Sequence, residues 1–278
     1  MQPMDHYEYA IRVTAFTAML VLMGLWELAA PRRGLSASKP IRWLSNISLL
    51  VLNSLAMRAG FALGAVGVAL VAREQRWGFF NVYSPPSWLE FILSVLLLDL
   101  AVYLQHVLFH AVPVLWRLHM VHHADPDFDV TTGLRFHTLE IGLSMLIKGA
   151  AIVLLGASPL AVLVFEVLLN LSSMFSHSNI AMPTWLDAAL RWVVVTPDMH
   201  RVHHSVIKDE ANSNFGFNLP WWDYLLGTYR SQPKAGHDSM RIGLLQIPPN
   251  RAVWLHRLLL LPFVQTEDAF PPDDARRS

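Results

Sequence analysis

Long apolar runs separated by short polar segments fill the first two thirds of the chain. The runs cover residues 10–30, 43–72, 87–110 and 139–177. A helix of about 20 apolar residues is long enough to cross a bilayer, so each of the first three runs predicts one span. The fourth run is too long for one span, and residues 156–159 (GASP) divide it into two arms. The pattern predicts an all-α, polytopic membrane protein whose last run is a membrane hairpin.

Polar residues interrupt this pattern in two ways. Asn53 and Arg58 lie inside the second run, and polar groups within a span usually face other helices rather than lipid. After residue 180 the chain becomes mixed, with amphipathic stretches at 184–195 and 251–263 that are typical both of membrane-surface helices and of ordinary packing helices. The charged, proline-containing tail after Phe270 predicts a flexible end.

The composition agrees with a membrane protein. Of the 278 residues, 54% are hydrophobic and 15% are charged, whereas soluble domains carry about 25% charged residues. The start of the chain lacks a basic segment, which favours a retained anchor over a cleaved signal peptide. The formal net charge is zero, so nothing indicates a nucleic-acid partner.

Basic residues predict the orientation of the spans. The loop at residues 31–42 carries four of them, Arg32, Arg33, Lys39 and Arg42, whereas the loop at residues 73–86 carries two. The positive-inside rule then places the first loop in the cytoplasm. The third run ends on that same side, which is where a series of histidines begins.

Eight histidines fall in three clusters with helical spacing. Residues three and four apart share one face of a helix, so each cluster directs its imidazoles to one point. The clusters are His106 and His110; His119, His122 and His123; and His200, His203 and His204. Two isolated histidines add to the set: His177, in FSHSN, and His137, in RFHTLE, with Glu140 one turn further on.

This donor set predicts two metal ions. The chain contains no cysteine, so a metal must be bound by nitrogen or oxygen. One ion rarely takes more than five or six imidazoles, and two neighbouring ions explain the number better. The HExxH and ExxH patterns of metalloproteases and carboxylate-bridged di-iron bundles are absent. Iron, a redox metal that can activate O2, is the favoured ion; zinc would imply hydrolysis through an activated water.

Asp99 extends the first cluster backward, because Asp99, Tyr103, His106 and His110 are four, three and four residues apart. Its carboxylate is therefore expected to accept a hydrogen bond from a ligand imidazole and so to fix the orientation of that ring. Direct ligation of a metal and an ion pair with Arg58 are the alternatives, since a carboxylate near a membrane needs a partner.

The three histidine clusters, which we call histidine boxes and number in chain order, resemble together with their surroundings the fatty acid hydroxylase / sterol desaturase superfamily of membrane di-iron oxygenases. The resemblance covers about residues 95–230. The matching segments are DLAVYLQHVLFH, WRLHMVHH, RFHTLE, FSHSNIAMP, HRVHH and NFGFNLPWWDYLLGTY. Two positions depart from the pattern of the superfamily. Thr138 replaces a usual proline, which makes the geometry around His137 less certain, and Phe215 replaces a usual tyrosine, which removes a hydroxyl near the site.

The resemblance implies a transmembrane helical stem with a cytoplasmic helical cap that holds two non-haem irons. The ten histidines are the expected ligands, with Asp99, Glu140 and Asn179 expected beside them. The expected domains are a stem at 1–94, a catalytic domain at 95–230 that includes the 139–177 hairpin, and an amphipathic helix with a flexible tail at 231–278.

The resemblance also implies O2-dependent hydroxylation or desaturation of a C–H bond of a lipid that reaches the site from the bilayer. No haem, flavin or dinucleotide motif occurs in the chain, so a separate ferredoxin or cytochrome is the expected electron donor. A di-zinc hydrolase and a divalent-metal transporter remain alternatives. The ligands of a transporter are expected near the middle of the bilayer, on broken helices, rather than at helix ends.

Overall fold

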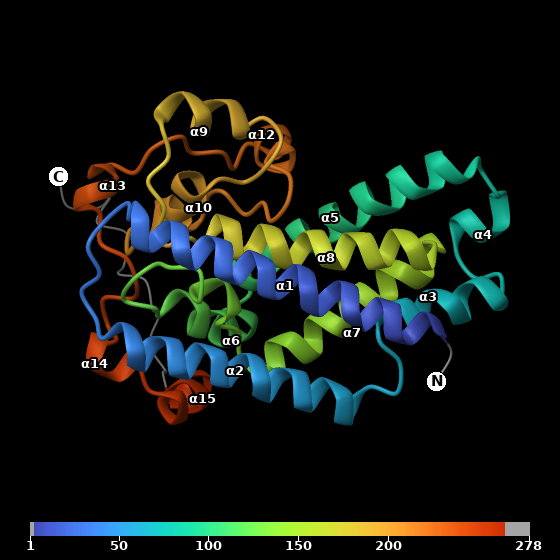
Figure 1. The fold of residues 1–278 in the computed structure, drawn as a ribbon, viewed down its shortest axis with the longest axis horizontal. Helices are drawn as coiled ribbons and strands as arrows, with labels where there is room; N and C mark the ends of the chain where they lie inside the picture. The colour runs from blue at the N-terminus through green and yellow to red at the C-terminus, as the bar shows by residue number, and fades with distance from the viewer. Residues whose placement is uncertain (1–2, 265–278) are drawn as a thin grey trace.

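The protein is described by a computed structural model that covers residues 3–264, and the tail after Phe270 lies outside the described residues. Within those residues the fold is all-helical and contains no β-strand, as the apolar pattern predicts. Five segments are long and apolar enough to cross a membrane: Tyr7–Ala29, Lys39–Tyr83, Ser87–Ala111, Thr138–Leu155 and Pro159–Ser176. Their long helices run side by side and form a stem, and the shorter helices other than α3 and α4 gather at one end of it as a cap (Figure 1).

The stem contains α1 (Pro3–Ala29), α2 (Lys39–Gly60), α5 (Ser87–Ala111), α7 (Thr138–Leu155) and α8 (Pro159–Ser176). The second apolar run is not one helix: α2 ends at Gly60, and α3 (Ala65–Glu74) and α4 (Phe79–Tyr83) follow. The break has a local cause, since the flanking positions Phe61 and Gly64 both have extended backbones. As a result α3 turns back and packs on α7 and α8.

Two glycines connect α4 to the turn between α7 and α8. Gly156 ends α7 with φ +69°, and Ser158 caps α8 by accepting a hydrogen bond from the Ala161 amide. A Cβ on Gly78 (φ +89°) would lie 2.2 Å from the Gly156 nitrogen, a distance that no side chain tolerates. The GASP sequence therefore separates the two hairpin helices and also provides the contact for α4.

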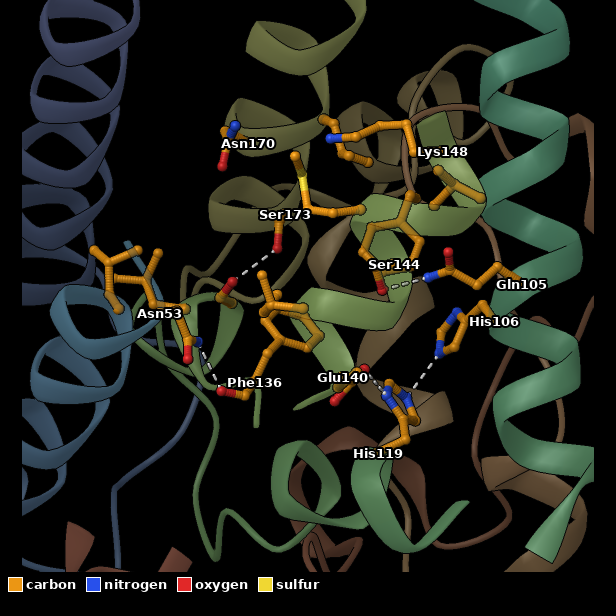
Figure 2. A pocket seen from close by; sticks show the side chains of 18 of the residues that line it. Asn53, Gln105, His106, His119, Phe136, Glu140, Ser144, Lys148, Asn170 and Ser173 are labelled. Carbon is orange, nitrogen blue, oxygen red and sulfur yellow. Dashed lines mark hydrogen bonds and ion pairs between the residues drawn. The ribbon is translucent and has the colours of Figure 1, made fainter. Parts of the chain in front are cut away.

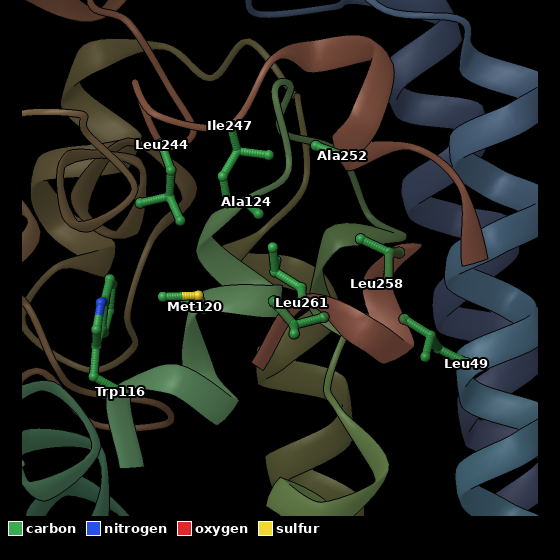
Figure 3. Close-up of a cluster of buried hydrophobic side chains, with 10 residues drawn as sticks. Leu49, Trp116, Met120, Ala124, Leu244, Ile247, Ala252, Leu258 and Leu261 are labelled. Carbon is green, nitrogen blue, oxygen red and sulfur yellow. The ribbon is translucent and has the colours of Figure 1, made fainter. Parts of the chain in front are cut away.

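The cap contains α6 (Pro113–His123), the 3₁₀ turn η1 (Thr132–Leu134) and a series of short helices. These are α9 (Thr184–Leu190), α10 (Pro197–His203), α11 (Lys208–Ala211), α12 (Trp221–Leu226), α13 (Gly236–Ser239), α14 (Pro249–Ala252) and α15 (Leu255–Val264). The stretch at 251–263 therefore forms α14 and α15. It packs against the cap and the stem, because Leu258 and Leu261 of α15 join a buried cluster with Met120 of α6 and Leu49 of α2 (Figure 3).

This apolar cluster positions the second histidine box. Met120 is 1% exposed and lies between His119 and His122 in the sequence, so its packing in this cluster fixes the rotation of α6 and with it the directions of the neighbouring imidazoles. Replacing a buried leucine by alanine in such a cluster costs about 2–5 kcal/mol. The C-terminal helix α15 thus stabilises the helix that presents three histidines.

Candidate metal centre

The structure brings nine of the ten predicted ligand histidines together in two adjacent groups. One nitrogen of each ring lies within 4.8 Å of the corresponding nitrogens of its group. The five-histidine group is His106, His110, His119, His123 and His203. The four-histidine group is His122, His177, His200 and His204. The groups come from the ends of α5, α6, α8 and α10, where the stem meets the cap.

The HxxHH spacing explains why there are two groups rather than one. In α6, the i and i+4 rings, His119 and His123, belong to the five-histidine group, and the i+3 ring, His122, belongs to the other. In α10 the division is reversed, because His200 and His204 belong to the four-histidine group and His203 to the five-histidine group. Each box therefore serves both groups, which places the two groups next to each other.

Hydrogen bonds fix the tautomers in the five-histidine group. His106 donates from Nδ1 to the Phe215 carbonyl at 2.7 Å, and the Nδ1 of His119 lies 2.7 Å from Glu140 Oε1. In a neutral imidazole the other nitrogen, Nε2, then carries a lone pair. The Nε2 atoms of His106 and His119 nevertheless face each other at 3.1 Å. Two facing lone pairs repel, and a cation between them removes the conflict.

The four-histidine group repeats this arrangement around His177. Its Nδ1 donates to the Ser173 carbonyl at 2.7 Å, and its Nε2 lies 3.0, 3.1 and 3.2 Å from the Nε2 atoms of His122, His200 and His204. Metal–imidazole bonds of about 2.1 Å place neighbouring ligand atoms about 3 Å apart at right angles. The spacing of these nitrogens therefore fits a single ion.

Two further observations agree with metal binding. The buried Nε2 of His203 has no hydrogen-bond partner among the described residues. Burial, reinforced by neighbouring imidazoles, also lowers the pKa of the grouped histidines near the cap. The pKa lies well below the ordinary value for His122, His123, His200, His203 and His204, and at about 4 for His177. These rings are therefore neutral at pH 7, which is the form that binds metals.

His137 lies outside both groups, which corrects the expectation that it is a ligand. It is the N-cap residue of α7: its Nδ1 accepts a hydrogen bond from the Leu139 amide at 3.2 Å. Its Nε2 points to the Leu259 carbonyl of α15, also at 3.2 Å. The usual proline is replaced here by Thr138, whose hydroxyl donates to Asn53. In the structure His137 therefore begins a helix and contacts α15.

Asp99 also differs from the expectation, because no described imidazole donates to it. Its carboxylate accepts hydrogen bonds from Trp222 Nε1 at 2.8 Å, from Asn218 Nδ2 at 2.9 Å and from the Leu219 amide at 3.3 Å. No ion pair between Asp99 and Arg58 occurs in the part of the chain that the structure describes. The segment before and within α12 folds against α5 and supplies these donors, so Asp99 fastens the cap to the stem.

Of the other two residues expected beside the ligands, Glu140 contacts His119, as described above, and Asn179 does not contact an imidazole. The side chain of Asn179 donates a hydrogen bond to the backbone carbonyl of Arg33 and accepts one from the backbone amide of Arg33. The backbone amide of Asn179 donates to the Glu27 carboxylate. Asn179 therefore joins the loop after α1 to the segment after His177. Glu27 also accepts a hydrogen bond from the backbone amide of Val130 at 2.7 Å. The sequence signal for this role was an acidic residue near the end of an apolar run, which needs hydrogen-bond partners.

A buried ion-pair network, not expected from the sequence, supports the second box. Arg42 of α2 lies 2.7 Å from both Asp125 and Asp129, and all three side chains are fully buried. Burial alone would raise the pKa of Asp125, but Arg42 and Arg135 outweigh it and lower the pKa to about 2. The Arg135 carbonyl in turn accepts a hydrogen bond from His122 Nδ1 at 3.2 Å. The sequence signals for this network were the basic loop at residues 31–42 and the acidic sequence DPDFD at residues 125–129.

An apolar cavity of about 360 Å³ connects the five-histidine group to the stem. We call it the histidine cavity; it is lined mostly by residues of α2, α5, α7 and α8, together with His119 of α6 and residues of η1. His106 and His119 lie at one end, and Lys148 and Asn170 lie at the other (Figure 2). A long apolar molecule in this cavity would reach the ligand rings from within the helical stem.

Comparison with known proteins agrees with this geometry. Residues 91–228 match the fatty acid hydroxylase family model. The chain belongs to the fatty acid hydroxylase family. The match begins in α5 and ends just after α12, so it contains all nine grouped histidines. No solved structure shows a significant match.

Several relatives of this fatty acid hydroxylase family member have names that describe lipid chemistry. The chain is 26% identical to the ornithine lipid hydroxylase OlsE of Rhizobium tropici, over 82% of this chain and 69% of the relative. It is 26% identical to the alkylglycerol monooxygenase of Homo sapiens, over 54% and 32%, respectively. It is 30% identical to the human cholesterol 25-hydroxylase, over 50% and 51%. The chain thus spans about a third to a half of the two human relatives.

Proposed function

We propose that this protein is a membrane-bound, O2-dependent di-iron oxidoreductase that hydroxylates or desaturates an unactivated C–H bond of a lipid. The observation that carries the proposal is the pair of histidine groups, in which bare imidazole lone pairs converge beside an apolar cavity. The named relatives are hydroxylases and a monooxygenase of lipids, which supports the same class of reaction. Fatty acyl chains, sterols and related lipids are the proposed substrate class.

In this proposal the five-histidine group binds one iron and the four-histidine group binds the other. Nitrogen ligands suit iron, and the donor set contains no thiolate and no carboxylate. The bound irons would supply the oxidising power that an unactivated C–H bond requires. The Phe215, Ser173, Ser213 and Arg135 carbonyls hold ligand rings by their Nδ1–H groups, so that each Nε2 faces the metal.

The chain itself provides the positioning. The walls of the histidine cavity are largely apolar, so they exclude water and favour a hydrocarbon segment over a polar one. His106 and His119 belong both to this wall and to the five-histidine group. A C–H bond at that end of the cavity is therefore presented to the ligand rings. Phe215 packs beside His106 and His110, where the superfamily usually has a tyrosine, and contributes no hydroxyl.

The proposal also assigns sides and domains. We place the 31–42 loop and the cap in the cytoplasm, because basic residues are concentrated in that loop. The N-terminal transmembrane domain then comprises residues 1–94, the catalytic domain residues 95–230 with the 139–177 hairpin, and the C-terminal segment residues 231–278. Electrons come from a separate ferredoxin or cytochrome that docks on the cytoplasmic cap.

Metal analysis tests the proposal. Protein purified without O2 after iron-replete expression should contain two irons per chain, one for each group. It should consume O2 when reductant and a long-chain lipid are both present, and mass spectrometry should detect a product that is heavier by one oxygen or lighter by two hydrogens. Zinc in place of iron after that expression would contradict the assignment and favour a hydrolase.

A further inference from the structure

A second cavity lies on the side of the histidine cavity that is away from the histidines. It has a volume of about 300 Å³ and is lined by residues of α1, α2 and α8, among them Arg12 and Arg58. We call it the arginine cavity. Three residues, Leu50, Ser54 and Asn170, line both cavities, so the two form neighbouring parts of one space inside the stem.

One of the two arginines that line this cavity has no carboxylate partner among the described residues. Arg12 pairs with Glu8 and Glu166, and Lys148, which lines the histidine cavity, also pairs with Glu166. Arg58 lies over the ring of Tyr9 at 5.7 Å, and no described carboxylate pairs with it. Arg58 is therefore the charged residue of the arginine cavity that has no carboxylate partner among the described residues, and it lies in the last turn of α2 with an exposed side chain. A cation beside the bilayer is costly without a partner, so this arginine favours an anion.

The position of this charge relative to the histidines is defined by the helices. Arg58 lies 16 residues after Arg42, which contacts the aspartates beside the second box, so the two are separated by about 24 Å along α2. Arg12 lies 15 residues before Glu27, which contacts the segment after His177, or about 22 Å along α1. Arg12 and Arg58 therefore lie along the stem away from the segments that hold the histidine clusters, while Met57, next to Arg58, still lines the histidine cavity.

We propose that the arginine cavity binds the anionic head group of the lipid substrate while the hydrocarbon chain of that lipid extends into the histidine cavity. The substrate is then an acidic lipid with a carboxylate or phosphate group, the oxyanions that guanidinium groups bind best. This inference rests on the proposed function. It adds that the oxidised carbon lies in the hydrocarbon chain and not beside the head group, because the arginines and the ligand rings line different parts of the joined cavities.

Lipid binding tests the proposal without turnover. The full chain, in detergent and without reductant, is titrated with two probes of equal chain length: a monoacyl lysophosphatidate, which is anionic, and the corresponding monoacylglycerol, which is neutral. We expect the wild type to bind the anionic probe about tenfold more tightly, a preference of the size that one ion pair away from bulk water supplies. Inorganic phosphate at millimolar concentration should not displace the probe, since it lacks the chain.

The variants assign the preference to one side chain. Arg58→Gln should abolish the preference for the anionic probe and leave binding of the neutral probe unchanged, whereas Arg58→Lys should keep most of the preference. Arg73→Gln is the matched control, because Arg73 is an exposed arginine of α3 that lines neither cavity. Thermal unfolding of each variant verifies that it is folded.

Three results would overturn the proposal. They are equal binding of both probes by the wild type, an unchanged preference in folded Arg58→Gln, and displacement by phosphate alone, which would indicate a site for a free anion. None of these results depends on iron or on turnover. A chain that binds acidic lipids as expected but has no oxygenase activity would contradict the proposed function and leave the head-group site intact.

Discussion

The Nε2 atoms of His122 and His177 lie 3.0 Å apart, although the Nδ1 atom of each ring faces a backbone carbonyl. Both Nδ1 atoms must be donors, so both Nε2 atoms carry lone pairs in the neutral rings. The arrangement is repulsive as it stands and becomes favourable around a cation. This relationship leads directly to a prediction about which histidines share an ion.

Substitution of single histidines should separate the two groups. His203→Ala should lower the iron content from two per chain to one by weakening the five-histidine group, and His122→Ala should do the same through the other group. Both variants should lose at least about 100-fold in activity, because losing a ligand costs more than losing a residue that orients one. His137→Ala, the control, should keep both irons. Full iron content in either ligand variant would show that the grouping is wrong.

Glu140→Gln should weaken metal binding without removing a ligand. The Glu140 carboxylate holds His119 by its Nδ1–H, and an amide in its place keeps an acceptor but loses the negative charge. The affinity for iron should fall by about 10–100-fold, the usual effect of changing a partner of a ligand histidine. Competition with a chelator measures this change. Glu74→Gln, at the exposed end of α3, should behave as the wild type, and the prediction fails if the two variants retain iron equally.

The buried Arg42 pairs should dominate the stability of the cap. Arg42→Gln leaves Asp129 buried without a cation and leaves Asp125 with only Arg135, 3.9 Å away, which costs about 3–5 kcal/mol. Chemical unfolding in detergent should show this loss, and Arg73→Gln provides the exposed comparison. If Arg42→Gln unfolded at the wild-type denaturant concentration, the network would be incidental to stability.

Local periodicity was sufficient to predict the helices and the gathering of the histidines, but not the division of each HxxHH cluster between two groups. Apolar residues that recur along a run depend only on neighbouring positions, and the HxxHH spacing directs rings from one helix face. Breaks such as the one at residues 61–64 were missed, since the apolar run continues through them.

Polar residues were harder to assign, because their partners depend on how distant segments meet. Asp99 has helical spacing with His106, yet the donors to its carboxylate come from residues near 220. Asn179 follows His177 by two residues, yet it bonds to the loop after α1. His137 has the residue type of a ligand, but its place at the start of α7 directs the ring to α15. The spacing of residues along a helix specifies which helix face they share, but it does not specify which distant segment packs against that face.

The orientation of the stem can be tested with the chain as it stands, because it contains no cysteine. Single cysteines at Ala37 and Gln75 should lie on opposite sides of the membrane, with Ala37 in the cytoplasm, because the 31–42 loop is the more basic one. Labelling of intact cells with a membrane-impermeant maleimide should therefore modify Gln75→Cys and spare Ala37→Cys until the membrane is opened. Modification of both in intact cells would exclude this topology.

Asp99→Asn should reduce stability while leaving the metal in place. The carboxylate accepts hydrogen bonds from Trp222, Asn218 and Leu219, and an asparagine amide would direct its own N–H groups toward some of these donors. Hydrogen bonds to a buried charge contribute about 1.5–3 kcal/mol, so we expect a loss of about 2 kcal/mol in the free energy of unfolding. Iron content at low temperature should stay at the wild-type value, because no described imidazole contacts Asp99.

A double-mutant cycle identifies the partner of Asp99. Trp222→Phe removes the Nε1 donor and keeps an aromatic ring, so its effect and that of Asp99→Asn should be less than additive if the two side chains act as a pair. Trp221→Phe is the neighbouring control, because the Trp221 Nε1 donates to the Trp192 carbonyl and not to Asp99. If folded Asp99→Asn lost iron while its stability stayed unchanged, Asp99 would instead be assigned a role in metal binding.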